Sequence, residues 1–224
     1  MKSANQSLLP KIKHFSVKSE LNKAVRIDPE LQSIIDEFGY PKSRRRNPDF
    51  ETLAKIINAQ QLSTRAAAAI WEKLELDCRG QVDARKILNR STDHLLKCGI
   101  SARKSDYLHG LAKQFVSGEV DPINLASLKD SDVMEKLVAI KGIGLWSAEI
   151  FAMFALGRRD IYPAGDLALQ EALKIFLKLG KRPDETKTRK IARRWSPHRS
   201  SVALLMWKLY GATTLDTNKK IRIN

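Results

Sequence analysis

The chain has 224 residues, of which 43% are hydrophobic and 29% are charged, so it is long enough to bury a core and too apolar to be wholly disordered. Its 40 Lys and Arg residues against 25 Asp and Glu residues give a formal net charge of +15, which favours a polyanionic partner, most often nucleic acid. No apolar run approaches the roughly 20 residues of a membrane span, the first ten residues contain no apolar signal segment, and the two cysteines are too few for a disulfide framework or a four-cysteine iron–sulfur cluster.

Helical periodicity recurs along the whole chain. In five places apolar residues fall at positions i, i+3, i+4 and i+7, which places one apolar stripe on each helix. These sets lie within residues 50–57, 67–74, 108–115, 169–176 and 202–209. Val and Thr are sparse and no segment alternates in polarity over six residues, so we expect essentially no sheet. The sequence therefore predicts an all-α fold of about ten short helices.

Capping signals and basic stretches divide the chain. Asp28-Pro29 is typical of an N-cap followed by a proline in the first helical turn. Residues 42–49 form a basic loop flanked by prolines. We predict a basic N-terminal tail over residues 1–17, a helical domain over residues 18–212 and a basic C-terminal tail over residues 213–224.

Two helices meet at a glycine-rich turn within residues 137–148. Its centre is Lys141-Gly142-Ile143-Gly144, and two glycines spaced by one residue allow a tight turn with positive φ and a close approach of the backbone to a ligand. The N–H groups at the start of the second helix form an anion site, to which Lys141 adds positive charge. Such a turn is either a plain connection between two helices or a site that binds a DNA phosphate regardless of base sequence. The net charge of the chain favours the phosphate-binding site.

The segment that follows carries an aspartate, Asp166, at the start of the helix that contains Leu169 and Leu173. Taken alone, this position is typical of an N-cap residue.

The turn and the aspartate together resemble the helix-hairpin-helix and Gly/Pro…Asp signature of a superfamily of DNA glycosylases. The matching residues are Lys141-Gly142-Ile143-Gly144, Trp146-Ser147-Ala148, Pro163 and Asp166. Residues 57–63, residues 99–104 and residues 195–200 with Trp207 resemble segments of the 3-methyladenine glycosylase branch, and the similarity runs from residue 20 to residue 212. The resemblance implies a two-lobed helical fold with the active-site cleft between the lobes.

The resemblance also assigns roles to individual residues. Asp166 would be the catalytic carboxylate and Leu62 the wedge that fills the space left by a flipped base. The walls of the base pocket would be Trp146, Trp207 and Gln61. The hairpin that binds a DNA phosphate would comprise Lys141, Gly142, Gly144 and Ser147. Core packing stays an alternative for Leu62, Trp146 and Trp207.

No cofactor is needed for the implied chemistry. The resemblance does imply a structural sodium or potassium ion in the hairpin, held by the backbone carbonyls of Val138, Ile140 and Ile143. The four histidines, His14, His94, His109 and His198, lack the spacing of a transition-metal site.

Alkylation at N3 of adenine or N7 of guanine makes the base a cationic leaving group, so a carboxylate beside the sugar suffices for its hydrolysis. Members with lyase activity carry a lysine where this chain has Trp146, so the resemblance implies a monofunctional glycosylase. Ile150 stands where some members place an aromatic residue, which implies a less aromatic pocket and a narrower or shifted range of bases. We expect a monomer that acts on alkylated double-stranded DNA at the nucleoid in the cytoplasm or in the nucleus, neither secreted nor membrane-bound. A binder of damaged or abasic DNA without catalysis and a basic helical scaffold protein are the alternatives.

Overall fold

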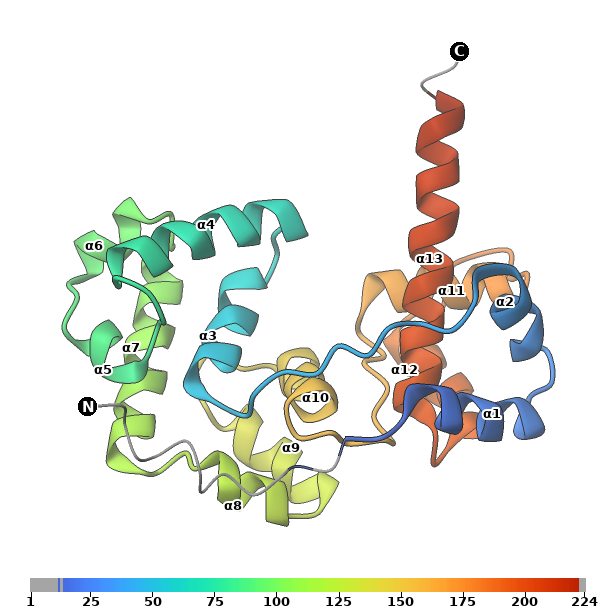
Figure 1. The fold of residues 1–224 in the computed structure, drawn as a ribbon, viewed down its shortest axis with the longest axis horizontal. Helices are drawn as coiled ribbons and strands as arrows, with labels where there is room; N and C mark the ends of the chain where they lie inside the picture. Colours follow the sequence, from blue (N-terminus) through green and yellow to red (C-terminus); the bar gives the residue numbers. More distant parts are fainter. Residues whose placement is uncertain (1–11, 13, 222–224) are drawn as a thin grey trace. The chain divides into compact units, whose positions relative to one another are not determined.

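The structure is a computed structural model that describes residue 12 and residues 14–221, and every regular element in that part of the chain is helical (Figure 1). The predicted all-α class is therefore confirmed. The chain divides into two compact units, unit 1 (Met1–Ile12 and Arg46–Leu156) and unit 2 (Lys13–Arg45 and Gly157–Asn224).

Unit 1 is built around one almost wholly buried helix, α10 (Leu145–Phe154), in which every residue from Ser147 to Phe154 is buried. This helix packs against α3 (Phe50–Ala59) and α9 (Asp130–Val138), and α3 in turn packs on α7 (Ala102–Ser117). The remaining helices of the unit are α4 (Thr64–Asp77), α5 (Ala84–Leu88), α6 (Thr92–Lys97) and α8 (Pro122–Ser127).

Side-chain caps explain where these helices begin. The side chains of Asp49, Ser63 and Ser101 accept hydrogen bonds from backbone N–H groups at the starts of α3, α4 and α7. Each cap satisfies a donor that has no partner within its own helix. Ser63 therefore begins α4 only four residues after the end of α3 at Ala59, and the short connection between them holds Gln61 and Leu62.

Unit 2 is organised around the long helix α13 (Arg199–Ile221), which packs against α1 (Val17–Ile27), α2 (Leu31–Phe38) and α11 (Leu167–Phe176). The predicted apolar stripe of α13 is buried, and Trp195 is buried beside it. Trp195 ends the short 3₁₀ helix η1 (Arg193–Trp195), which follows α12 (Glu185–Ala192).

Three expectations about boundaries are corrected. Asp28 is the C-cap of α1 instead of the N-cap of α2. Its carboxylate accepts a hydrogen bond from the buried Trp195 indole, which lies far along the chain, instead of capping a helix. Val17 is a buried residue of α1, so the helical domain starts before residue 18. Helix α13 runs on to Ile221 through most of the predicted tail 213–224, because no proline interrupts its hydrogen bonds. Residues 1–11, 13 and 222–224, which belong to the predicted tails, lie outside the described residues.

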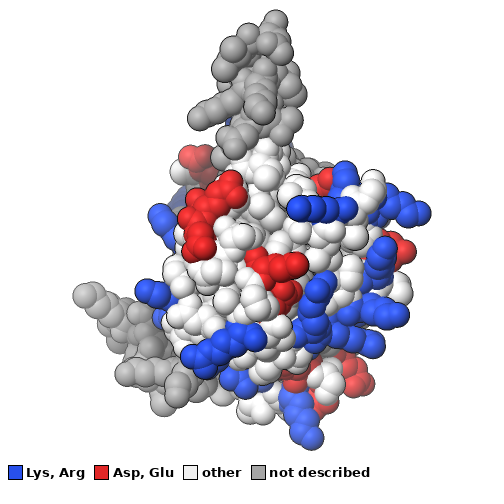
Figure 2. Space-filling view, turned by 90° about the vertical axis from the view of Figure 1, so that its right-hand side faces the viewer, with Lys and Arg blue, Asp and Glu red and all other residues white. Residues whose placement is uncertain are grey.

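The surface agrees with the basic composition. Figure 2 shows one face of the molecule, on which Lys and Arg side chains outnumber the smaller groups of Asp and Glu side chains. Among the described residues, none of the helices has both the length and the apolarity needed to cross a membrane.

Candidate active site

Asp166 in unit 2 is held by two N–H donors that meet the same carboxylate oxygen. It is the N-cap of α11, and its Oδ1 accepts a hydrogen bond from the Leu169 N–H at 3.0 Å. The indole Nε1 of Trp207 donates to the same oxygen at 3.1 Å. The N-cap interpretation is thus correct, and the second donor goes beyond what an N-cap requires.

The chain leading to Asp166 is fixed by hydrogen bonds within unit 2. The Asp166 N–H donates to the Pro163 carbonyl at 2.9 Å, and the Gln170 side chain donates to the Ala164 carbonyl at 2.9 Å. Ser200 on α13 accepts from the Ile161 N–H at 3.0 Å. The aspartate is therefore presented by a rigid turn and not by a free loop.

Two titratable groups, Asp160 and Tyr162, precede this turn in the chain. Arg199 makes two side-chain hydrogen bonds to the Asp160 carboxylate, at 2.7 and 3.0 Å, and Ser196 donates a third. Burial acts to raise the pKa of Asp160, but these hydrogen bonds and the charge of Arg199 outweigh it, so the pKa lies below its ordinary value. Burial, and then the charge of Asp166, raises the pKa of Tyr162, so this phenol stays neutral and is no candidate base.

Trp207 is half-buried on α13, whereas Trp195 is fully buried. Beyond its hydrogen bond to Asp166, its ring is covered by Arg44, whose Cζ lies 5.5 Å from the ring centroid. Simple core packing therefore does not describe Trp207. Its predicted contact with a flipped base stays a prediction.

The hairpin in unit 1 needs a glycine at only one of its two glycine positions. Gly142 has a φ of +93°, and a Cβ atom there would lie 2.3 Å from Cγ of Tyr107. Gly144, the N-cap of α10, has a φ of −86°, and a Cβ atom there would meet nothing within 4 Å. The turn therefore requires a glycine at position 142, whereas at position 144 the absence of a side chain leaves open space at the start of α10. Lys141, the residue before Gly142, is exposed.

The side chain of Ser147, a residue of the predicted phosphate-binding hairpin, points into unit 1. Ser147 is 2% exposed, and its Oγ accepts a hydrogen bond from Gln60 Nε2 at 3.0 Å. The same nitrogen donates to the Gly142 carbonyl at 2.8 Å, so both groups are held inside the turn. Only the backbone N–H of Ser147, in the first turn of α10, remains part of a predicted anion site.

Sequence reasoning missed Gln60 and Lys104 as supports of this region. The Lys104 ammonium donates to the carbonyls of Asn58 and Gln60, at 2.7 and 2.9 Å, and fixes the end of α3. Burial, and then the charge of Arg103, lowers the pKa of Lys104. Both residues lie in segments that carry the family resemblance. Their supporting role could not be found from local sequence, because the hydrogen bonds that they make join residues 44 to 87 positions apart.

Leu62 is not a core leucine. Its side chain is 39% exposed on the connection between α3 and α4, and it follows Gln61, which has a φ of +55°. Gln60 ties the start of this connection to the hairpin. Trp146, half-buried in the first turn of α10, lies in the same unit as Gln61 and Leu62, and Ile150 is buried one turn further on.

The three carbonyls proposed for a monovalent cation lie at the end of α9 and in the turn. Val138 is the last residue of α9, and the Ile140 carbonyl accepts a hydrogen bond from the Ile143 N–H at 3.0 Å. Carbonyl oxygens at a helix C-terminus carry partial negative charge, which suits a cation. Within the described chain, no group of three or more His, Cys, Asp or Glu side chains is placed to hold a metal ion.

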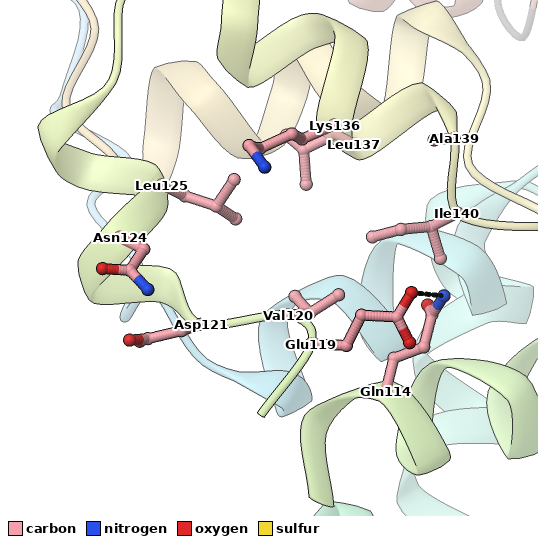
Figure 3. A pocket seen from close by; sticks show the side chains of 10 residues that line it. All are labelled: Gln114, Glu119, Val120, Asp121, Asn124, Leu125, Lys136, Leu137, Ala139 and Ile140. Carbon is pink, nitrogen blue, oxygen red and sulfur yellow. Dashed lines mark hydrogen bonds between the residues drawn. The ribbon is translucent and has the colours of Figure 1, made fainter. Parts of the chain in front are cut away.

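A hollow of about 290 Å³ lies in unit 1, partly lined by residues at the start of the hairpin (Figure 3). Its lining mixes apolar and polar side chains: Val120, Leu125, Leu137, Ala139 and Ile140 with Gln114, Glu119, Asp121, Asn124 and Lys136. None of these residues is aromatic, so the hollow offers no surface on which a base could stack. We therefore do not assign it as a base pocket.

Comparisons with known proteins agree with the motif. The model of the family described as "HhH-GPD superfamily base excision DNA repair protein" matches residues 54–198. The chain is 30% identical to the DNA-3-methyladenine glycosylase of Saccharomyces cerevisiae, over 88% of this chain and 80% of the relative.

Two solved structures resemble the chain over most of its length. The DNA-3-methyladenine glycosidase of Bacillus halodurans is 33% identical, with a TM-score of 0.77 over 90% of this chain and 94% of that one. The 3-methyladenine DNA glycosylase Mag1 of Schizosaccharomyces pombe, in complex with abasic DNA, is 29% identical, with a TM-score of 0.78 over 85% of this chain and 95% of that one.

Proposed function

Because the chain belongs to the HhH-GPD superfamily of base excision DNA repair proteins, we propose that it is a monofunctional DNA glycosylase for alkylated bases. It would hydrolyse the N-glycosidic bond of cationic bases such as 3-methyladenine and 7-methylguanine in double-stranded DNA and leave an abasic site. The observation that carries this proposal is the Asp166 carboxylate, which lies within the family's matched segment and accepts hydrogen bonds from two N–H donors. The names of the relatives support the substrate class, and the abasic DNA bound to Mag1 supports DNA as the partner.

The chemistry follows from the charge of the substrate. A cationic base leaves readily, so what the reaction still requires is stabilisation of an oxocarbenium-like sugar and an oriented water. A carboxylate can supply both, and one held in place beforehand needs little reorganisation during the reaction. Asp166 supplies this carboxylate.

The hairpin supplies the grip on DNA. Backbone N–H groups at the start of α10, the open approach at Gly144 and the charge of Lys141 together suit one phosphate group. A sodium or potassium ion held by the carbonyls of Val138, Ile140 and Ile143 would add positive charge there. The protein would act as a monomer on DNA, at the nucleoid or in the nucleus.

The proposal is tested by incubating the protein with methylated DNA and analysing the released bases by chromatography. Release of free 3-methyladenine or 7-methylguanine is expected. Tight binding to abasic or damaged DNA without any released base would instead support a non-catalytic binder.

Replacing Leu62 with Ala should lower the rate of excision from paired, stacked sites about tenfold. This factor corresponds to about 1.4 kcal/mol, which is part of the few kcal/mol that flipping a base costs. An exposed apolar side chain can fill the space left by a flipped base, and it matters only after the base has left the stack. Excision from damaged single strands and binding to undamaged duplex should be unchanged. The matched control is Leu76→Ala, an equally conservative change at another exposed leucine. Equal losses on all three substrates would contradict the wedge assignment.

The protein should show no lyase step, because Trp146 offers no amine that could form a Schiff base with the sugar. The measurement is borohydride trapping during excision from a duplex with one alkylated base, with a lyase of the same superfamily as the positive control. A covalent protein–DNA adduct at stoichiometric yield would show that another amine attacks the sugar.

A further inference from the structure

The basic loop after α2 is fastened across unit 2 at both of its ends. We call residues 39–45 the strap. Near its start, the Tyr40 carbonyl accepts a hydrogen bond from Lys208 on α13 at 3.2 Å, and the Tyr40 hydroxyl donates to Asn22 on α1 at 2.6 Å. Near its end, Arg44 lies over the ring of Trp207 on α13. The strap therefore brings a guanidinium to the tryptophan that contacts Asp166.

These contacts form a chain of three side chains within one unit. The Arg44 Cζ is 5.5 Å from the Trp207 ring centroid, and the Trp207 Nε1 is 3.1 Å from the Asp166 Oδ1. We infer that Arg44 is a positioning residue, which acts on Asp166 by holding the indole of Trp207. This inference rests on the proposed catalytic role of Asp166.

The direction of the indole N–H decides whether the hydrogen bond forms. Because this N–H lies in the plane of the ring, a rotation of the ring moves the donor away from the carboxylate. Trp207 is only half-buried, so surrounding core side chains constrain its ring less than they constrain Trp195. A cation over the ring face adds the missing constraint.

The same arrangement recurs where the carboxylate has a structural role. Arg194 lies 5.3 Å from the ring centroid of Trp195, whose Nε1 donates to Asp28 at 2.7 Å. Lys55 lies 5.1 Å from the ring of Trp71, whose Nε1 donates to Glu75 at 2.7 Å. In both cases the cation also lies within ion-pair distance of the same carboxylate, 3.7 Å for Arg194 and Asp28 and 3.6 Å for Lys55 and Glu75. A cation beside an indole that donates to a carboxylate thus recurs in this protein. At Trp207 the fixed carboxylate belongs to the proposed catalytic residue.

The consequence is a fixed carboxylate plane. Since Trp207 and the Leu169 N–H both donate to Oδ1, the other oxygen of Asp166 is turned away from both donors. Loss of the indole bond would remove one of the donors that hold Oδ1 and loosen the orientation of the carboxylate. The chemical step should then slow for every base, cationic or neutral, whereas loss of a pocket wall would affect cationic bases most.

The first test measures single-turnover excision at saturating protein. Arg44→Gln should lower this rate about two- to fivefold, the factor to which a cation–indole contact at an exposed site corresponds, and Arg44→Lys should restore part of it. Lys42→Gln, which removes one charge from an exposed position on the same strap, should leave the saturating rate unchanged. If Arg44→Gln weakens binding to abasic duplex but leaves the saturating rate intact, Arg44 is a phosphate contact and the inference is wrong.

The second test does not depend on activity. In ¹⁵N-labelled protein, the indole N–H signal of Trp207, assigned by its loss in Trp207→Phe, should shift in Arg44→Gln and exchange faster with solvent, but not in Lys42→Gln. An unchanged signal and exchange rate in Arg44→Gln would overturn the inference. Should the wild-type protein release no base, the proposed function fails, while the indole signal still decides whether Arg44 holds Trp207.

Discussion

Replacing Asp166 with Asn should abolish base release, lowering the single-turnover rate by more than about 100-fold. Asn removes the negative charge that the oxocarbenium-like sugar requires, but its amide oxygen can still accept the hydrogen bonds from Leu169 and Trp207. Because Asn and Asp are equally good N-caps, the start of α11 and the fold should be preserved. The measurement is single-turnover excision from a duplex with one alkylated base, combined with affinity for abasic duplex, which should change little.

A second aspartate in unit 2 provides the matched control. Asp184 is the N-cap of α12, where its side chain accepts from the Lys187 N–H at 2.8 Å. Asp184→Asn should leave excision unchanged, because this carboxylate caps α12 and Asn caps a helix equally well. If Asp166→Asn also excises at close to the wild-type rate, Asp166 is an N-cap and not a catalytic residue.

Replacing Gly142 with Ala should destabilise unit 1 by about 2–5 kcal/mol. The φ of +93° is unfavourable for a residue with a Cβ atom, and that atom would lie 2.3 Å from the Tyr107 ring, so either the turn or α7 must move. The free energy of unfolding, measured by urea titration, checks this expectation. DNA affinity should fall with it, because the N–H groups of the hairpin would no longer point in one direction.

Gly144→Ala makes the same chemical change two residues away. It should cost at most about 1 kcal/mol, since space is open there and alanine is merely a poorer N-cap than glycine. Any loss of affinity for abasic duplex in this variant then reports a side chain in the path of a phosphate. Equal stability losses in both variants would contradict the distinct roles of the two glycines.

The helical class and most of the helices could be predicted from sequence, because apolar periodicity and capping residues act over a few positions. The motif residues Gly142 and Asp166 were singled out by the family resemblance, because local patterns alone predicted only a turn and an N-cap. Sequence spacing did not reveal which glycine has positive φ, since this depends on how the turn packs against Tyr107.

Long-range contacts account for what could not be predicted. The Trp207–Asp166 hydrogen bond joins residues 41 positions apart, and the bond from Gln60 to the Gly142 carbonyl joins residues 82 positions apart. No local pattern encodes such pairs. Asp28 is a further example of a contact that local sequence does not predict. The Asp-Pro pair predicted a helix N-cap, whereas the Asp28 carboxylate accepts a hydrogen bond from the Trp195 indole, 167 positions away.

The most direct test of the account is to count products from a defined duplex that carries one 7-methylguanine. Free base and alkali-labile sites should appear in equal amounts, without strand breaks before alkali treatment and without a protein–DNA adduct. A duplex that is bound but yields no free base, or one that is cut at the damaged site before alkali treatment, would contradict the proposed hydrolytic, monofunctional glycosylase.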